Sequence, residues 1–337
     1  MKAVAYHTPG SVEREDSLQD ISLEKPVATG RDLLVSVKAV SINPVDTKLR
    51  NAVPPEGSEW KVLGFDASGV VEAVGDEVEN FKPGDSVFYA GSIARPGTNS
   101  EFHLVDERIV GRKPTNLSDA EAAALPLTAI TAWEMLFDRL EVKRPTPEGA
   151  GLILVIGGAG GVGSITIQLL RALTDLTVIA TASRPETQDW VKECGAHHVI
   201  DHRQPLAPQV AALGLGAPGF VFSTTQTHRH MADIAELIAP QGRFGLIDDP
   251  ENLSVMPLKR KAVSLHWELM FTRSLFGTPD MAEQGKLLSE VAALAESGKI
   301  RSTATETAGK IDAATLRKVH ALIESGTARG KIVLEGF

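Results

Sequence analysis

The stretch LILVIGGAGGVGSITIQLL, residues 152–170, decides the fold of this chain. Its apolar start predicts a buried strand, and Gly158, Gly160 and Gly163 follow at once in the spacing GxGxxG. Between a strand and a helix, such glycines permit a tight turn, let the backbone approach a pyrophosphate and bring the helix against the strand. The helix N-terminus offers N–H groups and the positive end of its dipole to phosphates. The stretch therefore predicts a dinucleotide site, with an ordinary glycine-rich turn as the alternative.

The next apolar run, TVIATAS, indicates which dinucleotide is bound. It ends about 20 residues after the last glycine of the motif, where NAD-selective folds carry an Asp or Glu for the ribose 2′-hydroxyl. This chain has Ser183 and Arg184 there. A guanidinium can pair with a 2′-phosphate, and no carboxylate at that position repels it. We therefore expect NADPH as the cofactor, unless Arg184 is merely a solvated surface charge.

The texture of the chain predicts two domains, as its 337 residues also suggest. Up to about Lys113, short apolar runs alternate with turn clusters, which is typical of a partly open antiparallel β-barrel. After a helix start at Ser118 and Glu121, fully apolar runs alternate with helical patterns, which indicates a doubly wound parallel sheet. The fold class is thus α/β. We predict a Rossmann domain over 123–271 and a barrel domain over 1–122 and 272–337.

Composition excludes several classes of partner and site. The net charge is −9, whereas nucleic-acid and anionic-membrane partners require clustered Lys and Arg. The start MKAVAYHTPG lacks the apolar core of a signal peptide, and no run has the roughly 18 apolar residues of a membrane span. We therefore expect a cytoplasmic protein. Cys194 is the only cysteine, so neither an internal disulfide nor a four-cysteine zinc site is possible.

The whole chain resembles the medium-chain dehydrogenase/reductase superfamily, in particular the NADPH:quinone reductase (zeta-crystallin-like) branch with its zinc-type alcohol dehydrogenase-like proteins. The matching segments are SINPVDTKLR, GFDASGVVEAVG, FKPGDSVFYAG, AAALPLTAITAWE, IGGAGGVG, CGAHHVIDH, PQGRFGLI and RGKIVL. The resemblance implies that the barrel is a GroES-like catalytic domain.

Zinc ligands known from related dehydrogenases are missing from these segments. Zinc-dependent relatives carry a Cys in the segment matching SINPVD, a His-Glu pair at the positions of Phe65 and Asp66, and a Cys near Leu127. Two histidine pairs remain as possible ligands, His197 with His198 and His228 with His230. Neither pair has the helical i, i+4 spacing of a zinc site. We therefore predict no metal, and an alcohol dehydrogenase with atypical ligands remains the alternative.

The absence of a Lewis acid determines which substrates are feasible. Alcohol oxidation needs a species close to an alkoxide. The parent alcohol is about as weak an acid as water, and zinc can lower the pKa of bound water to about 7. Hydride addition to a quinone or an α,β-unsaturated carbonyl instead gives a delocalised phenolate or enolate, and a phenol has a pKa of about 10. One or two buried donors, each contributing about 3 kcal/mol, supply the remaining stabilisation. We expect hydride transfer from NADPH to such an electrophile, with a non-catalytic NADPH-binding protein as the rival.

The resemblance also implies the site residues. Asn43, Asp46 and Thr131 are expected near the nicotinamide. Many quinone reductases carry a tyrosine close after the NPVD motif, where this chain has LRNAVPP, so Tyr89, one of two tyrosines in the chain, is the further candidate catalytic residue. The expected cofactor contacts are Gly158, Ala159, Gly160, Gly161, Val162, Gly163, Ser183, Arg184, His202, Ile247 and Lys331, with His202 and Lys331 near the 2′-phosphate. Structural alternatives exist, because Asn43 can fix a turn, Tyr89 can pack in a strand and Thr131 can bond to its own helix.

Association of two or more copies is a further expectation. The run AVSLHWELMF, residues 262–271, can pair edge to edge with a second copy in a homodimer or homotetramer, unless it is an interior strand of a monomer. We expect substrate contacts from loops at residues 51–60 and 267–276.

Overall fold

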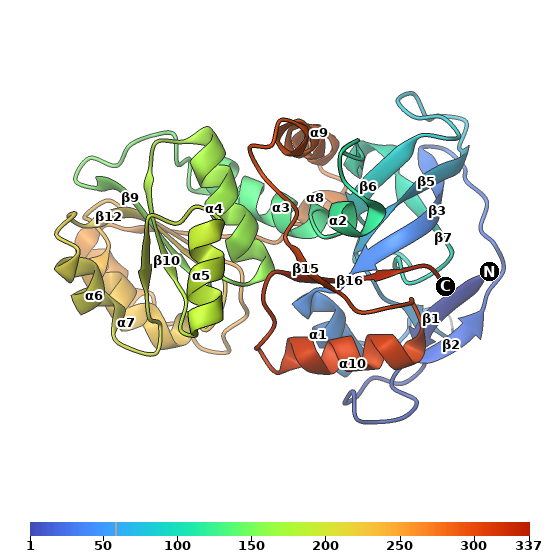
Figure 1. Cartoon of the computed structure of the whole chain (residues 1–337), viewed down its shortest axis with the longest axis horizontal. Coiled ribbons are helices and arrows are strands. Elements are labelled where there is room, and N and C mark those ends of the chain that lie inside the picture. The colour runs from blue at the N-terminus through green and yellow to red at the C-terminus, as the bar shows by residue number, and fades with distance from the viewer. Residues whose placement is uncertain (58) are drawn as a thin grey trace. The chain divides into compact units, whose positions relative to one another are not determined.

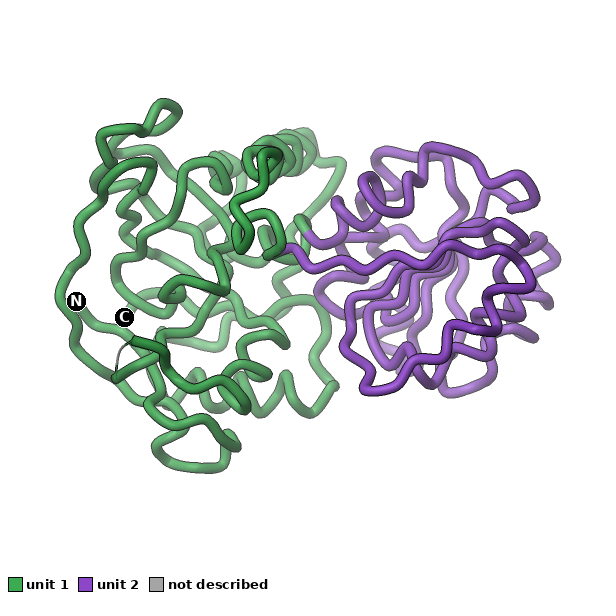
Figure 2. Tube along the Cα trace, turned by 180° about the vertical axis from the view of Figure 1, so that it is seen from behind, with its two compact units in different colours: residues 1–130, 271–337 green, residues 131–270 purple. Residues whose placement is uncertain are grey.

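The computed structural model describes residues 1–57 and 59–337, so the predicted loop at 51–60 includes one residue, Ser58, outside the described residues. The chain forms two compact units: residues 1–130 with 271–337 are unit 1, and residues 131–270 are unit 2 (Figure 2). The predicted division lay at 122/123 and 271/272. The first boundary lies later in the chain, because helix α2 (Asp119–Ala123) packs on the sheet of unit 1. The residues up to the middle of α3 (Pro126–Trp133) therefore also belong to unit 1.

Unit 2 is the predicted Rossmann-like domain. Its described residues form a parallel sheet in the order β11-β10-β9-β12-β13-β14. The strands are β9 (Ala150–Ile156), β10 (Thr177–Thr181), β11 (His198–Ile200), β12 (Pro218–Ser223), β13 (Arg243–Leu246) and β14 (Ser264–Trp267). Strand order reverses at β9, whose neighbours are β10 and β12, and this reversal is the switch point at which such sheets bind ligands.

Helices cover both faces of that sheet because its strands are apolar on both sides. Figure 1 shows α4 and α5 on one side and α6 and α7 on the other. Their bounds are α4 (Gly161–Leu173), α5 (Pro185–Glu193), α6 (Leu206–Ala212) and α7 (Thr227–Leu237), and a 3₁₀ turn η3 (Met256–Lys261) precedes β14. All six residues of β12 are buried, as expected for a strand covered on both faces.

Unit 1 is the predicted barrel domain. One sheet runs β15-β16-β3-β5-β6-β8, with β7 also paired to β3, and a second runs β2-β1-β4. Their bounds are β1 (Lys2–Tyr6), β2 (Gln19–Ser22), β3 (Asp32–Ser41), β4 (Lys61–Val62), β5 (Asp66–Val74), β6 (Ser86–Ala90), β7 (Phe102–Asp106), β8 (Val110–Arg112), β15 (Ala304–Thr307) and β16 (Lys331–Glu335). The antiparallel pairing of Val333 with Ser41 brings the C-terminal strand back to the first domain, as predicted.

One helix of unit 1, α2, begins where the sequence signals place it. Ser118 and Glu121 form the predicted capping box, with the Ser118 N–H donating to Glu121 Oε2 at 2.9 Å. The chain then breaks at Pro126, continues as α3 and ends in a π-helical stretch, η2 (Glu134–Arg139). The other helices are α1 (Pro44–Ala52), η1 (Glu107–Ile109), α8 (Thr272–Phe276), α9 (Glu283–Glu296) and α10 (Ala313–Glu324). Within the described ranges, we find no helix with the length and apolarity to cross a membrane.

Candidate functional site

The glycine-rich turn of unit 2 has the geometry of a phosphate cradle. It joins β9 to α4, whose N-cap residue is Gly160. A Cβ on Gly163 would lie 2.3 Å from the carbonyl oxygen of Gly157, so helix and turn touch through backbone alone. A Cβ on Gly160 would meet its nearest atom only at 3.6 Å, which leaves the turn open to a ligand. Close packing at the third glycine and open space at the second are what pyrophosphate binding requires.

The predicted cofactor residues of unit 2 gather at one edge of the sheet. Ala159 in the turn after β9 is partly exposed, as are Gly161 and Val162 in the first turn of α4, whereas Gly158 is buried. The others also follow strand ends: Ser183 and Arg184 come after β10, His202 after β11 and Ile247 after β13, and all four are partly exposed. Because carboxyl ends of parallel strands meet at the same edge, the structure groups these residues as a dinucleotide site requires.

Thr181 connects two of these strand ends and was missed by the sequence reasoning. Its hydroxyl accepts the Gly157 N–H at 3.0 Å and lies 3.1 Å from His202 Nδ1. Burial lowers the pKa of His202, with further effects from Asp201, Arg203 and Arg184. The lowered pKa favours the neutral form of the ring, and the hydrogen bond to Thr181 holds the ring beside the turn. The signal in the sequence that could have identified Thr181 is a hydroxyl residue at the end of the apolar run that forms β10.

Arg184 has a carboxylate partner that the sequence interpretation overlooked. The backbone of Arg184 caps α5, with its N–H donating to Thr187 Oγ1 at 3.1 Å. The turn into the helix places Glu186 Oε1 3.1 Å from Arg184 Nε. The position after β10 holds Ser183 and Arg184 as the sequence shows, but the helix start brings the carboxylate of Glu186 beside Arg184.

A second cluster of polar side chains is buried in unit 1. Asp66 Oδ2 accepts hydrogen bonds from Ser41 Oγ at 2.8 Å and Asn43 Nδ2 at 2.8 Å, and it lies 3.1 Å from Lys331 Nζ. Asp66 Oδ1 accepts the backbone N–H of Leu127 at 2.7 Å. Three of these contacts fall on Oδ2 and one on Oδ1, so both oxygens of the carboxylate are engaged within unit 1.

Lys331 has a different role from the one expected. Its ammonium group donates to Ile42 O at 2.9 Å, to Asn43 Oδ1 and to Asp66 Oδ2, and the residue is only 3% exposed. An ammonium has three protons, and each has an acceptor inside unit 1. This placement argues against the expected contact with a ribose phosphate. Burial lowers the pKa of Lys331, whereas Asp66 and Asp46 act in the opposite direction.

Asn43 and Asp46, two of the predicted catalytic residues, belong to the same buried cluster. Both ends of the Asn43 amide are engaged, by Lys331 and by Asp66. Asp46 accepts the N–H groups of Asn43 at 2.8 Å and Gly64 at 2.9 Å, and burial raises its pKa to about 7. These contacts favour the structural interpretation of both residues, and a direct role at the nicotinamide stays a prediction.

Tyr89 and Thr131, the other two predicted catalytic residues, are also buried. His103 Nε2 lies 3.0 Å from the carbonyl oxygen of Pro96 and must carry its proton there. Burial lowers the pKa of His103 to about 4, so its Nδ1 is unprotonated and accepts the Tyr89 hydroxyl at 3.0 Å. The hydroxyl proton of Tyr89 is thus donated to His103 inside the core, and this contact favours the packing interpretation of Tyr89. Thr131 is 5% exposed in α3, and its role stays a prediction.

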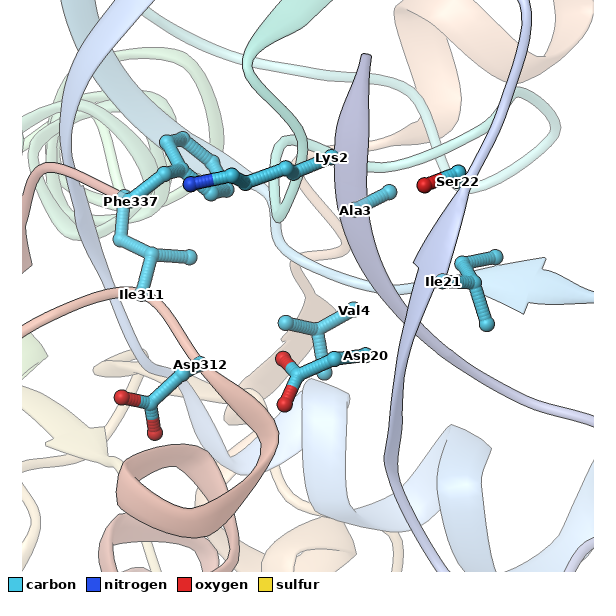
Figure 3. A pocket seen from close by; sticks show the side chains of 9 residues that line it. All are labelled: Lys2, Ala3, Val4, Asp20, Ile21, Ser22, Ile311, Asp312 and Phe337. Carbon is cyan, nitrogen blue, oxygen red and sulfur yellow. The ribbon is translucent and has the colours of Figure 1, made fainter.

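A pocket of about 370 Å³ in unit 1 is separate from all the predicted site residues (Figure 3). Its polar lining includes Asp20 and Asp312. Both carboxylates hold the start of α10, since Asp20 accepts the Ala313 N–H at 2.9 Å and Asp312 accepts the Thr315 N–H at 2.8 Å. Both carboxylates are therefore engaged in holding α10, and because none of the predicted site residues lines this pocket, it is not the candidate site.

Comparison with known proteins identifies the family. A profile described as a zinc-binding dehydrogenase matches residues 194–334, and one described as an alcohol dehydrogenase GroES-like domain matches residues 29–115. A zinc-type alcohol dehydrogenase-like protein of Staphylococcus aureus is 38% identical over 336 residues, with 99% of both chains covered. The chain belongs to the medium-chain dehydrogenase/reductase superfamily. As a member of this superfamily, it is an NAD(P)-dependent oxidoreductase.

Further members of the superfamily share the whole architecture. A human mitochondrial NAD(P)H oxidoreductase is 30% identical over 337 residues, covering 90% of this chain and 81% of the relative. A Rhizobium etli crystal structure, described as a candidate zinc-dependent alcohol dehydrogenase, is 65% identical with a TM-score of 0.99, covering 100% of this chain and 98% of that chain. The Escherichia coli quinone oxidoreductase complexed with NADPH has the same fold, with a TM-score of 0.82 at 22% identity and 99% and 100% coverage.

The zinc in several of these descriptions does not fit the residues of this chain. Asp66 is the single carboxylate at the expected metal loop, and Lys331 already neutralises it. Its neighbour Phe65 packs edge-on against Phe271, with ring centroids 5.1 Å apart. No cluster of three or more His, Cys, Asp or Glu side chains suited to a metal occurs within residues 1–57 and 59–337. The ammonium group of Lys331 already pairs with the Asp66 carboxylate that a zinc ion at this loop would need as a ligand.

Proposed function

We propose that this oxidoreductase is a zinc-independent, NADPH-dependent reductase of quinones or α,β-unsaturated carbonyls. The observation that carries the proposal is the Lys331–Asp66 ion pair, because it engages the carboxylate of the metal loop, and the described residues offer no cluster of His, Cys, Asp or Glu that could replace it as a zinc site. Substrates that delocalise the charge they receive are then favoured over alcohols, whose alkoxide requires a Lewis acid.

The residues of unit 2 fit the proposed cofactor. The Gly158–Gly163 turn and the N-terminus of α4 would hold the pyrophosphate, Arg184 the 2′-phosphate and His202 the adenosine side. When bound, NADPH supplies the hydride for the reduction. The residues of the chain bind NADPH and orient it towards the substrate. Positioning a reactant beside its acceptor contributes much of the rate enhancement in such reactions.

One experiment separates the proposal from its two rivals. We expect purified protein to oxidise NADPH with 1,4-quinones or enones, to contain substoichiometric zinc by elemental analysis and to keep its activity in EDTA. Stoichiometric zinc with activity on primary or secondary alcohols would contradict the proposal and favour an alcohol dehydrogenase with atypical ligands. NADPH binding without turnover of any acceptor would favour a non-catalytic binding protein, for which the buried engagement of Tyr89 is the supporting observation.

We also propose that β14 is the edge at which copies of this chain associate into a homodimer or homotetramer. Within the part of the chain that the structure describes, β14 pairs only with β13. Trp267 and Leu269 are each 52% exposed beside this edge, and an open apolar edge favours strand pairing with another chain. Trp267→Lys is expected to shift the solution mass, measured by light scattering, to that of one chain. A monomeric wild type would contradict the proposal.

A further inference from the structure

The corner where β10 meets α5 contains two opposite charges. Arg184 is the residue before the helix, and Glu186 is the second residue within it. Arg184 Nε lies 3.1 Å from Glu186 Oε1, and the two side chains are 38% and 55% exposed. An exposed ion pair of this kind contributes little to stability. The same ion pair can nevertheless change the affinity for a charged ligand that binds at this corner.

The pair lies near other residues of the candidate dinucleotide site. Arg184 is among the charges that act on His202, which follows β11, the strand next to β10. In folds of this type the ribose that carries the 2′-hydroxyl or 2′-phosphate binds at the end of the second strand of the unit, here β10. A ligand group that approaches Arg184 there also approaches the carboxylate of Glu186.

We propose that Glu186 limits the preference for NADPH that Arg184 creates, so that the chain accepts NADH as well; this inference rests on the proposed function. A phosphate monoester carries about −1.5 to −2 charges at pH 7. It must therefore compete with Glu186 for the guanidinium and is repelled by the carboxylate. A 2′-hydroxyl can instead donate a hydrogen bond to that carboxylate, as it does to the Asp or Glu of NAD-selective folds. One side chain thus weakens NADPH binding and strengthens NADH binding.

The test measures dissociation constants for NADPH and NADH by calorimetry, with no acceptor present. Glu186→Gln is expected to raise the affinity ratio of NADPH to NADH on the order of fivefold, and high salt is expected to reduce this gain. Arg184→Ala is expected to lower the ratio. Asp189→Asn is the matched control, because Asp189 lies on the same helix in an exposed pair with Lys192 at 3.3 Å. Its ratio is expected to stay within about twofold of the wild-type ratio.

The outcomes distinguish a failure of the role of Glu186 from a failure of the proposed function. A ratio that Glu186→Gln leaves unchanged, or that Asp189→Asn raises equally, would overturn the role of Glu186 while NADPH binding by the wild type still supports the proposed function. A wild type that binds neither dinucleotide would overturn the proposed function and this inference together. Circular dichroism of each variant confirms that the fold is retained.

Discussion

Replacing Lys331 with methionine is expected to destabilise unit 1 by about 3 to 5 kcal/mol, because it leaves the buried carboxylate of Asp66 without its counter-charge. The methionine keeps most of the side-chain volume, so the loss reports charge and not a cavity. Asn43 would also lose the donor to its amide oxygen, which adds an unsatisfied acceptor to the interior. Chemical denaturation followed by circular dichroism measures the free energy of unfolding.

Two further variants show whether the ion pair itself is responsible. The double variant Lys331→Met with Asp66→Asn is expected to recover part of the loss, since residue 66 then no longer leaves an unpaired charge in the interior. Lys310→Met removes the same charge from an exposed position and is expected to change stability by less than about 0.5 kcal/mol. If Lys331→Met behaves like Lys310→Met, the ion pair does not stabilise the unit, and the argument that it takes the place of a metal loses its support.

The general fold could be predicted because its signals are local. A strand, a glycine spacing and an amphipathic helix follow one another within residues 152–173, and the turn they predict is the one observed. Ser118 and Glu121 likewise marked a helix start within four residues. Local patterns of this kind do not depend on what the rest of the chain does, so the sequence alone reveals them.

The buried cluster of unit 1 could not be predicted because its contacts are distant in sequence. Lys331 and Asp66 are 265 positions apart and meet only because β16 pairs with β3, whose neighbour β5 begins with Asp66. The residue type of Lys331 suggests a phosphate ligand, whereas its position at the start of the buried strand β16 indicates a partner inside the protein. Glu186 could not be predicted for a different reason: its contact with Arg184 depends on how the chain turns into α5, which brings residues i and i+2 together.

The glycine-rich turn allows the second strong prediction, which concerns Gly163. Alanine at this position would place its Cβ 2.3 Å from Gly157 O and 2.7 Å from Gly158 Cα, and both are backbone atoms that cannot rotate away. The turn and α4 must therefore move apart. Hydrogen bonds to a charged group contribute about 1.5 to 3 kcal/mol each, and the loss of one or two of them at the pyrophosphate would weaken NADPH binding on the order of 100-fold, which is the result expected for Gly163→Ala. Fluorescence titration with NADPH measures the loss.

Gly151 provides the matched control for this substitution, because it lies on β9 in the same unit and a Cβ there would meet no atom within 4 Å. Gly151→Ala is expected to bind NADPH as the wild type does. Gly160→Ala separates the two tasks of the motif: its Cβ fits the protein, with Gly157 O at 3.6 Å, yet it occupies the side from which a pyrophosphate approaches. It should therefore keep its thermal stability and lose affinity. If both Gly160→Ala and Gly163→Ala bound NADPH like Gly151→Ala, the turn would not be the phosphate site, and its glycines would serve packing alone.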